Sequence, residues 1–353
     1  MLPDVGPVLA RNLVSYCGSV EAIFRKKKSQ LERIPGIGPV TAASIAGHKV
    51  FEKAEKEVGL IRKNRVDHFF YLDDGYPQRL KNCEDAPVIL FKKGNANLSG
   101  TKMLAVVGTR HATEYGKELT ARLVQDLAGH DVTVVSGMAY GVDIAAHKYC
   151  VQHHVPTIAV LAHGLDRLYP GIHRPVAEKM LSKGALVTEY PSGTNPDREN
   201  FPARNRIVAG MCDATVVVES GLKGGALITA DIANSYNRDV FAFPGRVSDE
   251  FSLGCNELIR RNKAMLVQTA AEILAVMNWV PEAKQARPRQ LSLIHELKEE
   301  EKMLVDILRN GKCDIDTISL RAGMPASKIS STLLSLEFAG ILKSMPGKMY
   351  ELI

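Results

Sequence analysis

The sequence predicts an α/β fold: a doubly wound parallel sheet, preceded by a helical unit and followed by a small helical unit with a terminal hairpin. Three observations indicate this arrangement. Short apolar segments alternate with helical patterns from about residue 100, a Gly/Pro motif is repeated near the N-terminus, and a linker rich in Pro, Lys, Arg and Gln precedes the C-terminal segment. The length of 353 residues suits two or three folded units.

The strand candidates are short, rich in Val and Ile, and lack polar alternation, as expected of strands that helices cover on both faces. They are Met103–Val107, Val132–Val135, Thr157–Leu161, Ala185–Thr188, Ala214–Val218, Val240–Ala242 and Met265–Val267. Helical patterns separate them, for example at Glu114–Ala128, Val142–His153 and Ala226–Asn237. Such alternation gives right-handed crossovers and therefore an extended Rossmann-like sheet over residues 67–280, with Val88–Phe91 as an extra strand.

Residues 1–66 contain an internal repeat at an offset of 32, which pairs Leu2–Ala10 with Ile34–Ala42. Each copy is a Gly/Pro turn that leads into an apolar-periodic helix, and the second resembles a helix-hairpin-helix motif. A turn of this kind offers backbone N–H groups to a phosphate. Asp4 replaces the first glycine in copy one. DNA contact by copy two and a purely structural hairpin both stay open.

The same segment carries the excess positive charge. It holds twelve Lys and Arg residues and six Asp and Glu residues. Its excess of six positive charges equals the net charge of +6 for the whole chain. A concentrated positive face attracts nucleic acid. An ordinary solvated helix surface is the alternative interpretation.

The C-terminal segment, residues 296–353, follows a predicted linker at 281–295 and has the element order of a winged helix. Its predicted elements are the helices Glu299–Leu308, Ile315–Ala322 and Ser327–Phe338 and the strands Ile341–Lys343 and Met349–Leu352, joined by Pro346-Gly347. The segment is net negative, and Lys328 is the one base of its third helix. Proteins that recognise double-stranded DNA usually carry Arg or Asn in this helix. We therefore predict a partner-binding or weak DNA-binding role for the segment.

The sequence lacks the motifs that are typical of several classes of protein. No apolar run approaches the ~20 residues of a membrane span, and the N-terminus lacks a secretory pattern. The six cysteines contain no CxxC pair and are typical of free thiols, so we expect a cytoplasmic protein. There is no G-x-G-x-x-G after the first strand, no Gly-Lys-[Ser/Thr], no metal-ligand spacing and no G-x-S-x-G. We therefore predict no cofactor, no metal and no catalytic residue.

Polar and glycine-rich segments follow five of the strands and are expected to meet at one rim, because ligands of open parallel sheets bind beyond the carboxyl ends. They are Gly108–Thr113, Ser136–Asp143, His163–Asp166 with Tyr169-Pro170, Glu189–Pro191 leading to Phe201–Arg206, and Glu219–Gly221 with Gly224–Thr229. Backbone N–H groups and arginines together bind phosphate. Phe201 is either a core ring or a stacking platform for an unpaired base.

Charged and imidazole side chains near this rim allow other interpretations. Glu189, Glu219 and Asp231 could act as acid or base in a hydrolase, although such carboxylates more often cap helices or pair with arginines. His147 and His163 are expected to be packing or orienting residues.

In several of these motifs, the sequence resembles the DNA-processing protein A (DprA/Smf) family over roughly residues 68–275. The runs that carry the resemblance are Val107–Arg110, Ser136–Gly137, Gly141–Asp143 with His147, Tyr169-Pro170, Phe201–Arg206, Leu227–Ala230, Phe243–Gly245 and Gly254–Ile259. The resemblance implies cooperative single-stranded DNA binding, protection of incoming DNA and delivery of the RecA recombinase during natural transformation. It also implies a homodimer built through the sheet, and no catalysis.

The resemblance and the rim together give the predicted nucleic-acid-binding residues: Gly108, Thr109, Arg110, Ser136, Gly137, Phe201, Arg204, Asn205, Arg206, Gly225, Thr229 and Lys263. Two departures from the family pattern stand out. Gly224 replaces the usual serine before Gly225, and Asn262-Lys263 replaces a glycine and adds a positive charge.

Two other functions compete with single-stranded DNA binding. A nucleotide-processing hydrolase of the phosphoribohydrolase type would share this kind of sheet. However, the stretch Gly221–Ala226 lacks the proline and the acid of that family's motif. A double-stranded transcription regulator is suggested by the winged helix and disfavoured by its charge.

Overall fold

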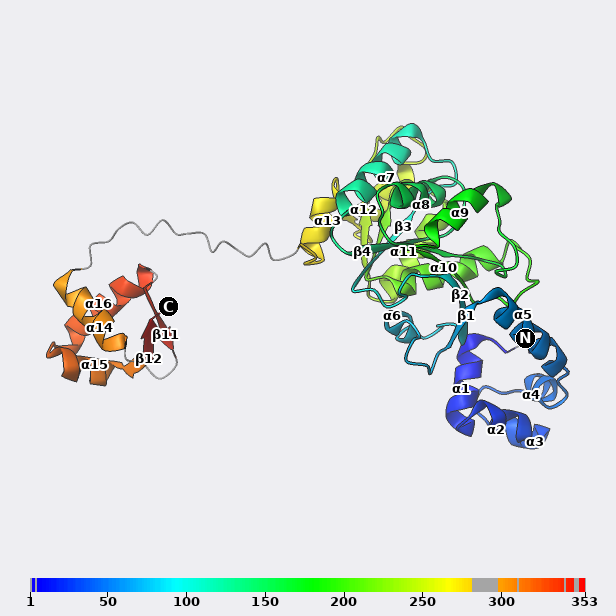
Figure 1. Cartoon of the computed structure of the whole chain (residues 1–353), viewed down its shortest axis with the longest axis horizontal. Coiled ribbons are helices and arrows are strands. Elements are labelled where there is room, and N and C mark those ends of the chain that lie inside the picture. Colours follow the sequence, from blue (N-terminus) through cyan, green and yellow to red (C-terminus); the bar gives the residue numbers. More distant parts are fainter. Residues whose placement is uncertain are drawn as a thin grey trace. The chain divides into compact units, whose positions relative to one another are not determined.

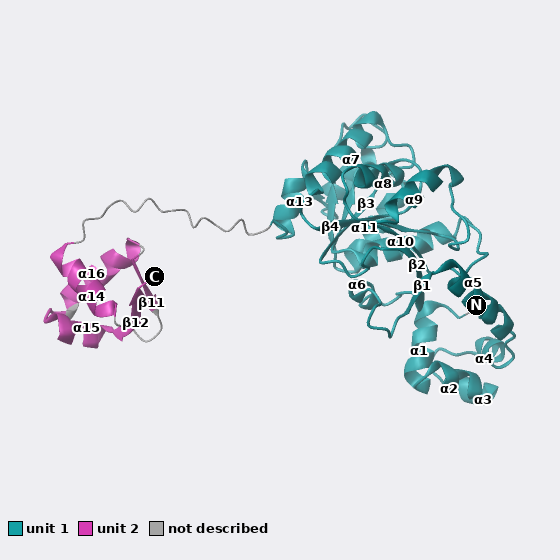
Figure 2. Ribbon diagram, viewed as in Figure 1, with its two compact units in different colours: residues 1–281 teal, residues 282–353 magenta. Residues whose placement is uncertain are grey.

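The computed structural model describes residues 2–3, 5–280, 298–309, 311–339, 341–345 and 349–352. The chain forms two compact units, residues 1–281 and 282–353, shown in different colours in Figure 2. The predicted linker at 281–295 and the turn at Pro346-Gly347 lie outside the described residues.

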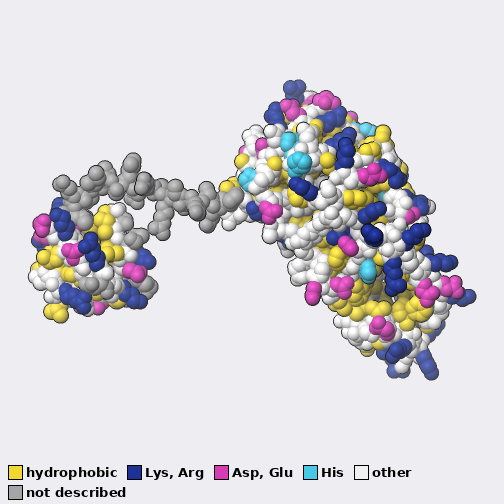
Figure 3. Space-filling view, in the orientation of Figure 1, with side chains coloured by type: hydrophobic (Ala, Val, Ile, Leu, Met, Phe, Trp, Pro, Cys, Tyr) yellow, Lys and Arg dark blue, Asp and Glu magenta, His cyan; other side chains and the backbone are white. Residues whose placement is uncertain are grey.

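Five helices form the N-terminal part of the first unit. They are α1 (Pro7–Cys17), α2 (Val20–Arg25), α3 (Lys28–Leu31), α4 (Pro39–Ala46) and α5 (Phe51–Asn64). The repeat predicts the starts of α1 and α4: each follows an extended glycine, Gly6 or Gly38, and has proline at its first position, where a missing N–H costs nothing. Positive charge is exposed here, and Figure 3 shows Lys and Arg side chains over α2, α3 and α5.

A nine-stranded sheet follows, with the order β1-β2-β6-β5-β4-β3-β7-β8-β9. Its strands are β1 (Asp67–Phe70), β2 (Ile89–Gly94), β3 (Lys102–Val107), β4 (Val132–Ser136), β5 (Thr157–Val160), β6 (Ala185–Thr188), β7 (Ala214–Val217), β8 (Asp239–Ala242) and β9 (Met265–Leu266). Neighbours from β6 to β9 pair in parallel, whereas β2 is antiparallel to both β6 and β1. The predicted doubly wound sheet is confirmed, and β1 is an additional edge strand.

Helices cover both faces of the sheet (Figure 1). They are α6 (Gln78–Lys81), α7 (Glu114–Leu127), α8 (Val142–Gln152), a 3₁₀ turn (Gly171–His173), α9 (Arg174–Met180), α10 (Asn200–Met211), α11 (Gly225–Ser235), α12 (Leu253–Arg260) and α13 (Ala270–Val276). Met103 and Ala105 of β3 pack with α10 and α11, while Leu104 and Val106 pack with α7 and α8. All four are fully buried, which explains the uninterrupted apolar run.

The N-terminal helices share a core with the sheet, because their buried residues belong to the same apolar cluster as Leu80 and Leu90. Polar contacts reinforce this junction. The Arg11 guanidinium of α1 donates to the carbonyls of Cys83 (2.9 Å), Glu84 (3.3 Å) and Lys81 (3.3 Å). The Glu57 carboxylate of α5 accepts hydrogen bonds from Ser192. The helical hairpins therefore brace the sheet, whatever else they contact.

The second unit is a winged helix. Its elements are α14 (Glu299–Leu308), β10 (Cys313–Asp314), α15 (Ile315–Ala322), α16 (Ala326–Phe338), β11 (Leu342–Met345) and β12 (Met349–Leu352). The strands form one sheet of order β10-β12-β11, and Leu304, Ile318 and Leu333 pack in its core. The predicted helices and both predicted strands are present, and β10 is a two-residue addition. Within the described ranges of both units, no helix is long and apolar enough to cross a membrane.

Replacing Arg11 with alanine is expected to lower the free energy of unfolding of the first unit by about 2 kcal/mol, because charge-assisted hydrogen bonds to backbone carbonyls are lost. The single tryptophan, Trp279, is buried in the core of that unit, so its fluorescence during urea unfolding reports the change. Arg33→Ala, which removes an exposed arginine of the same segment, is the control. An unchanged midpoint for Arg11→Ala would contradict this role.

Candidate nucleic-acid interface

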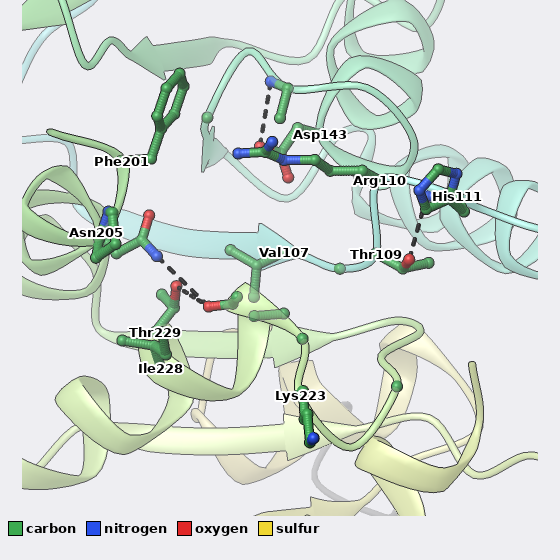
Figure 4. Close-up of a pocket in the computed structure, with 18 of the residues that line it drawn as sticks. Val107, Thr109, Arg110, His111, Asp143, Phe201, Asn205, Lys223, Ile228 and Thr229 are labelled. Atoms are coloured by element: carbon green, nitrogen blue, oxygen red, sulfur yellow. Dashed lines mark hydrogen bonds between the residues drawn. The ribbon is translucent and has the colours of Figure 1, made fainter. Parts of the chain in front are cut away.

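A pocket of about 850 Å³ lies at the carboxyl ends of β3, β4 and β7 (Figure 4). The strand order reverses at β3, with β4 on one side and β7 on the other, and ligands in open sheets bind at such a switch point. Its lining comes from residues 107–111, 137–143, 196–208 and 221–229 and from the 250–253 segment. The segment after β5 contributes Tyr169, while His163–Asp166 lies outside the pocket lining.

Arg110 is an exposed cation at this pocket. Its guanidinium carbon lies 5.1 Å from the centre of the Phe201 ring, and Figure 4 shows its side chain extending toward that ring. Thr109, the preceding residue, is buried: its N–H donates to the Glu219 carbonyl at 2.7 Å, and its hydroxyl accepts from the N–H of His111. Hydrogen bonds within the protein therefore fix this turn before any ligand binds.

The loop after β4 packs directly against this turn. Gly141 has a φ of +77°, and a Cβ at this position would lie 2.1 Å from the Thr109 carbonyl oxygen, so a larger residue would displace the turn that carries Arg110. A Cβ at Gly137 would lie 2.3 Å from an Asp143 carboxylate oxygen and 2.6 Å from the Arg204 guanidinium. Position 141 therefore requires glycine, whereas a larger residue at 137 would have to displace the Asp143 and Arg204 side chains.

Arg204 and Asp143 form the floor of the pocket beneath Gly137. Arg204 is only 5% exposed and donates to the carbonyl of Val160. Burial lowers the pKa of Arg204 and raises the pKa of Asp143, and the charge of each group opposes the shift of the other. The Asp143 carboxylate accepts from the N–H of Ala139 at 3.4 Å. Arg204 thus supports the loop and offers little surface to a phosphate.

Helices α10 and α11 form the opposite wall. Asn205 of α10 and Thr229 of α11 both donate to the carbonyl of Gly225, at 3.5 and 3.4 Å (Figure 4). Gly224 caps α11 without a side-chain hydrogen bond. A Cβ there would lie 2.2 Å from the Ser220 hydroxyl, so Ser220 occupies the space of the serine that the family pattern places at 224. The backbone N–H groups of this helix start remain at the pocket.

Nine of the twelve predicted residues line the pocket: Gly108, Thr109, Arg110, Gly137, Phe201, Arg204, Asn205, Gly225 and Thr229. The structure does not bring Ser136, Arg206 or Lys263 there. Ser136 is fully buried and its hydroxyl donates to the Val106 carbonyl. Lys263 pairs with Asp231 at 2.7 Å.

Arg206 corrects the expectation that three arginines share one pocket. It pairs with Glu189 at 2.6 Å and lies 3.9 Å from Asp85. Phe201–Arg206 belongs to α10 rather than to a loop, and two residues along a helix turn a side chain by about 200°. Arg204 and Arg206 therefore point to opposite sides of α10.

The predicted binding residues do not include Tyr169, Arg198 and Lys223, which also line the pocket, although Tyr169 lies in a segment that the sequence predicts at the rim. Arg198 and Lys223 are exposed cations, and neither forms an ion pair with a described residue. The Tyr169 ring centre lies 6.1 Å from that of Phe201. Lys223 could have been found, since it lies within the glycine-rich stretch after β7. Arg198 follows a polar segment without a recognisable pattern.

The carboxylates considered as acid or base groups are engaged in structural contacts. Glu219 accepts from the N–H and hydroxyl of Thr113 at the start of α7, and Glu189 and Asp231 pair with Arg206 and Lys263. Burial raises the pKa of Glu189, and Arg206 opposes this shift. Among the described residues, no group of His, Cys, Asp and Glu could hold a metal.

Two histidines orient the loops, as predicted. His147 Nε2 donates to the Gly137 carbonyl, and burial lowers the pKa of His147 to about 4. His163 Nε2 accepts from the N–H of Tyr169 at 3.2 Å.

The third helix of the winged helix, α16, presents an apolar surface. Leu334 and Phe338 are exposed one turn apart, and Lys328 pairs with Glu300 of α14. The partner-binding or weak DNA role of this domain stays a prediction.

Comparisons with known proteins identify all three parts of the chain. Residues 67–278 match the sequence model of DNA recombination-mediator protein A, residues 286–348 match the DprA winged helix domain, and residues 1–46 match a SAM-like helix-hairpin-helix tandem. A putative DNA processing protein DprA from Mycobacterium tuberculosis is 34% identical over 350 residues, covering 95% of this chain and 88% of the relative.

Solved structures of DNA processing protein A also resemble this chain. The X-ray structure of DNA processing protein A from Streptococcus pneumoniae matches with a TM-score of 0.68 at 32% identity, covering 77% of this chain and 93% of that one. DNA processing protein A from Helicobacter pylori, whose structure describes its single-stranded DNA binding mode, matches with a TM-score of 0.55 at 27% identity, covering 61% and 96%. The family match over residues 67–278 and these relatives show that the chain belongs to the DNA recombination-mediator protein A family.

Proposed function

We propose that this protein binds single-stranded DNA in the pocket at the ends of β3, β4 and β7, independently of base sequence. It would protect incoming DNA and deliver the RecA recombinase onto it during natural transformation, acting as a homodimer. DNA is bound in this proposal, and no covalent bond is made or broken.

The observation that carries the proposal is the placement of the Arg110 guanidinium over the Phe201 ring. A cation attracts a phosphate, and an aromatic face stacks on a base, so one nucleotide can satisfy both groups. Arg198 and Lys223 add positive charge to the same pocket. Bases in a duplex are stacked on each other and leave no face for Phe201, which favours an unpaired strand.

The comparisons support the same ligand and the wider role. The Helicobacter pylori relative is described by its single-stranded DNA binding mode, and the family is described as a recombination mediator. Delivery of a recombinase is consistent with that description. The apolar surface of α16 is available for a protein partner.

The homodimer is supported by the last strand of the sheet. β9 is a short edge strand whose residues Met265 and Leu266 are 52% and 45% exposed. An edge strand leaves backbone N–H and C=O groups unpaired, and these can pair with another chain. We place the contact between two copies there.

The first test is a titration of single-stranded and duplex DNA of equal length. The single strand is expected to bind more tightly, and Arg110→Ala to weaken its binding about tenfold for any base sequence, because a charge-assisted phosphate contact is lost. The slope of log K against log salt should become shallower by about 0.7. Arg122→Ala is the matched control, since Arg122 is exposed on α7 and pairs with Glu118. Unchanged affinity in Arg110→Ala would refute the assignment.

Arg206→Ala is expected to behave differently. The folded variant should keep the affinity of the wild type, but its free energy of unfolding should fall by about 3 kcal/mol, because the largely buried carboxylate of Glu189 loses its partner. Without Arg206 the pKa of Glu189 rises further, so the folded protein holds that proton more tightly than the unfolded chain. The loss of stability relative to wild type should therefore shrink as the pH falls below neutrality and Glu189 becomes protonated. A pH-independent loss, or weaker DNA binding by the folded variant, would argue against this position for Arg206.

Leu266→Lys is expected to convert the dimer to a monomer, because a charge on each edge strand repels its partner. Sedimentation or light scattering measures the mass. Leu72→Lys, at an exposed leucine elsewhere on the first unit, should leave the dimer intact. A wild-type monomer, or a Leu266→Lys dimer, would refute the edge-strand contact.

A further inference from the structure

The pocket contains a second pair of rings besides Tyr169 and Phe201. The ring centres of His111 and Phe251 lie 6.1 Å apart, with an angle of 26° between their planes, and both residues line the pocket. His111 is exposed and Phe251 is half-buried. The proposed function assigns neither of them a role.

Hydrogen bonds anchor the backbone that carries each ring. The N–H of His111 donates to the Thr109 hydroxyl at 3.1 Å, and the carbonyl of Phe251 accepts from the N–H of Ser220 at 2.7 Å. Ser220 lies three residues after the end of β7, and Thr109 lies two residues after the end of β3. The backbone at both rings is therefore anchored next to neighbouring strands of the sheet, which lowers the entropy cost of stacking a base on them.

Arg110 lies between the two ring pairs. Arg110 and His111 are consecutive residues, yet Figure 4 shows their side chains diverging, with Arg110 extending toward Phe201 and His111 on the other side. The guanidinium lies over the Phe201 ring, while the imidazole stacks with Phe251. One exposed cation thus has an aromatic surface on either side.

Charge favours a base rather than a phosphate beside Phe251. Glu250, the adjacent residue, is exposed and lines the same pocket, so its carboxylate repels a phosphate there. A nucleobase is uncharged and has a face that stacks on any ring.

We infer that His111 and Phe251 form a second base-stacking position, so that Arg110 binds a phosphate between two nucleotides of one strand. One base stacks on Phe201 and the other on the His111–Phe251 pair. This inference rests on the proposed function, because it names how the same pocket divides a single strand into phosphate and base contacts.

The test compares a short oligothymidylate with an oligonucleotide of equal length in which every nucleotide is abasic. His111→Ala and Phe251→Leu in the full-length protein should each raise the Kd for oligothymidylate about tenfold, which is within the range measured for loss of one stacked base. Neither should change the Kd for the abasic strand, which keeps the phosphates. Arg110→Ala should weaken binding of both strands.

His68→Ala is the matched control, since His68 is exposed on β1 and outside the pocket. The exposed position of His111 keeps the test valid if Phe251→Leu fails to fold. Unchanged oligothymidylate binding in His111→Ala would overturn the inference, and so would an equal loss on the abasic strand. These outcomes leave the proposed function intact, which instead fails if the wild type does not bind oligothymidylate or if Arg110→Ala has no effect.

Discussion

Close backbone packing between the loops after β3 and β4 determines where the binding groups lie. Val142 begins α8 by donating its N–H to the Thr109 carbonyl at 3.2 Å, and Gly141 leaves room for this approach. Arg110 is carried by the same turn, so its position follows from the sheet and from α8 rather than from its own contacts. A site held in this way loses little conformational entropy when a ligand binds.

Below that contact, a buried charge supports the loop instead of binding the ligand. The Arg204 guanidinium and the Asp143 carboxylate fill the space beneath Gly137. Each charge favours the ionised form of the other against the cost of burial. The floor is therefore close to neutral, and the exposed positive charge lies with Arg110, Arg198 and Lys223. A phosphate is attracted to the rim and not into the floor.

The sequence predicts much of this site because runs of buried residues and glycine-rich strand ends leave a clear pattern. The sequence could not show that Gly137 lines the pocket while Ser136 does not. This difference depends on where β4 ends, because Ser136 is its last residue and its side chain lies in the core. The sequence also could not show that Arg204 lines the pocket while Arg206 does not, because this difference follows from the helical geometry of α10, and the sequence predicts a loop there. Pro202 lies in the first turn of α10, where proline is well tolerated. The short strands β1 and β10 are defined by pairing, which no local pattern reveals.

In the proposed function, the cations and the aromatic rings have different roles in the selection of unpaired DNA. Attraction between Arg110 and a phosphate is available to single and double strands alike, and it weakens as salt rises for both. Contact with Phe201 requires an exposed base face, which only the unpaired strand provides, and stacking depends little on ionic strength. The cations therefore supply capture and the rings supply discrimination. In this proposal, the preference for the single strand comes from the aromatic groups, even though most of the attraction at a distance is electrostatic.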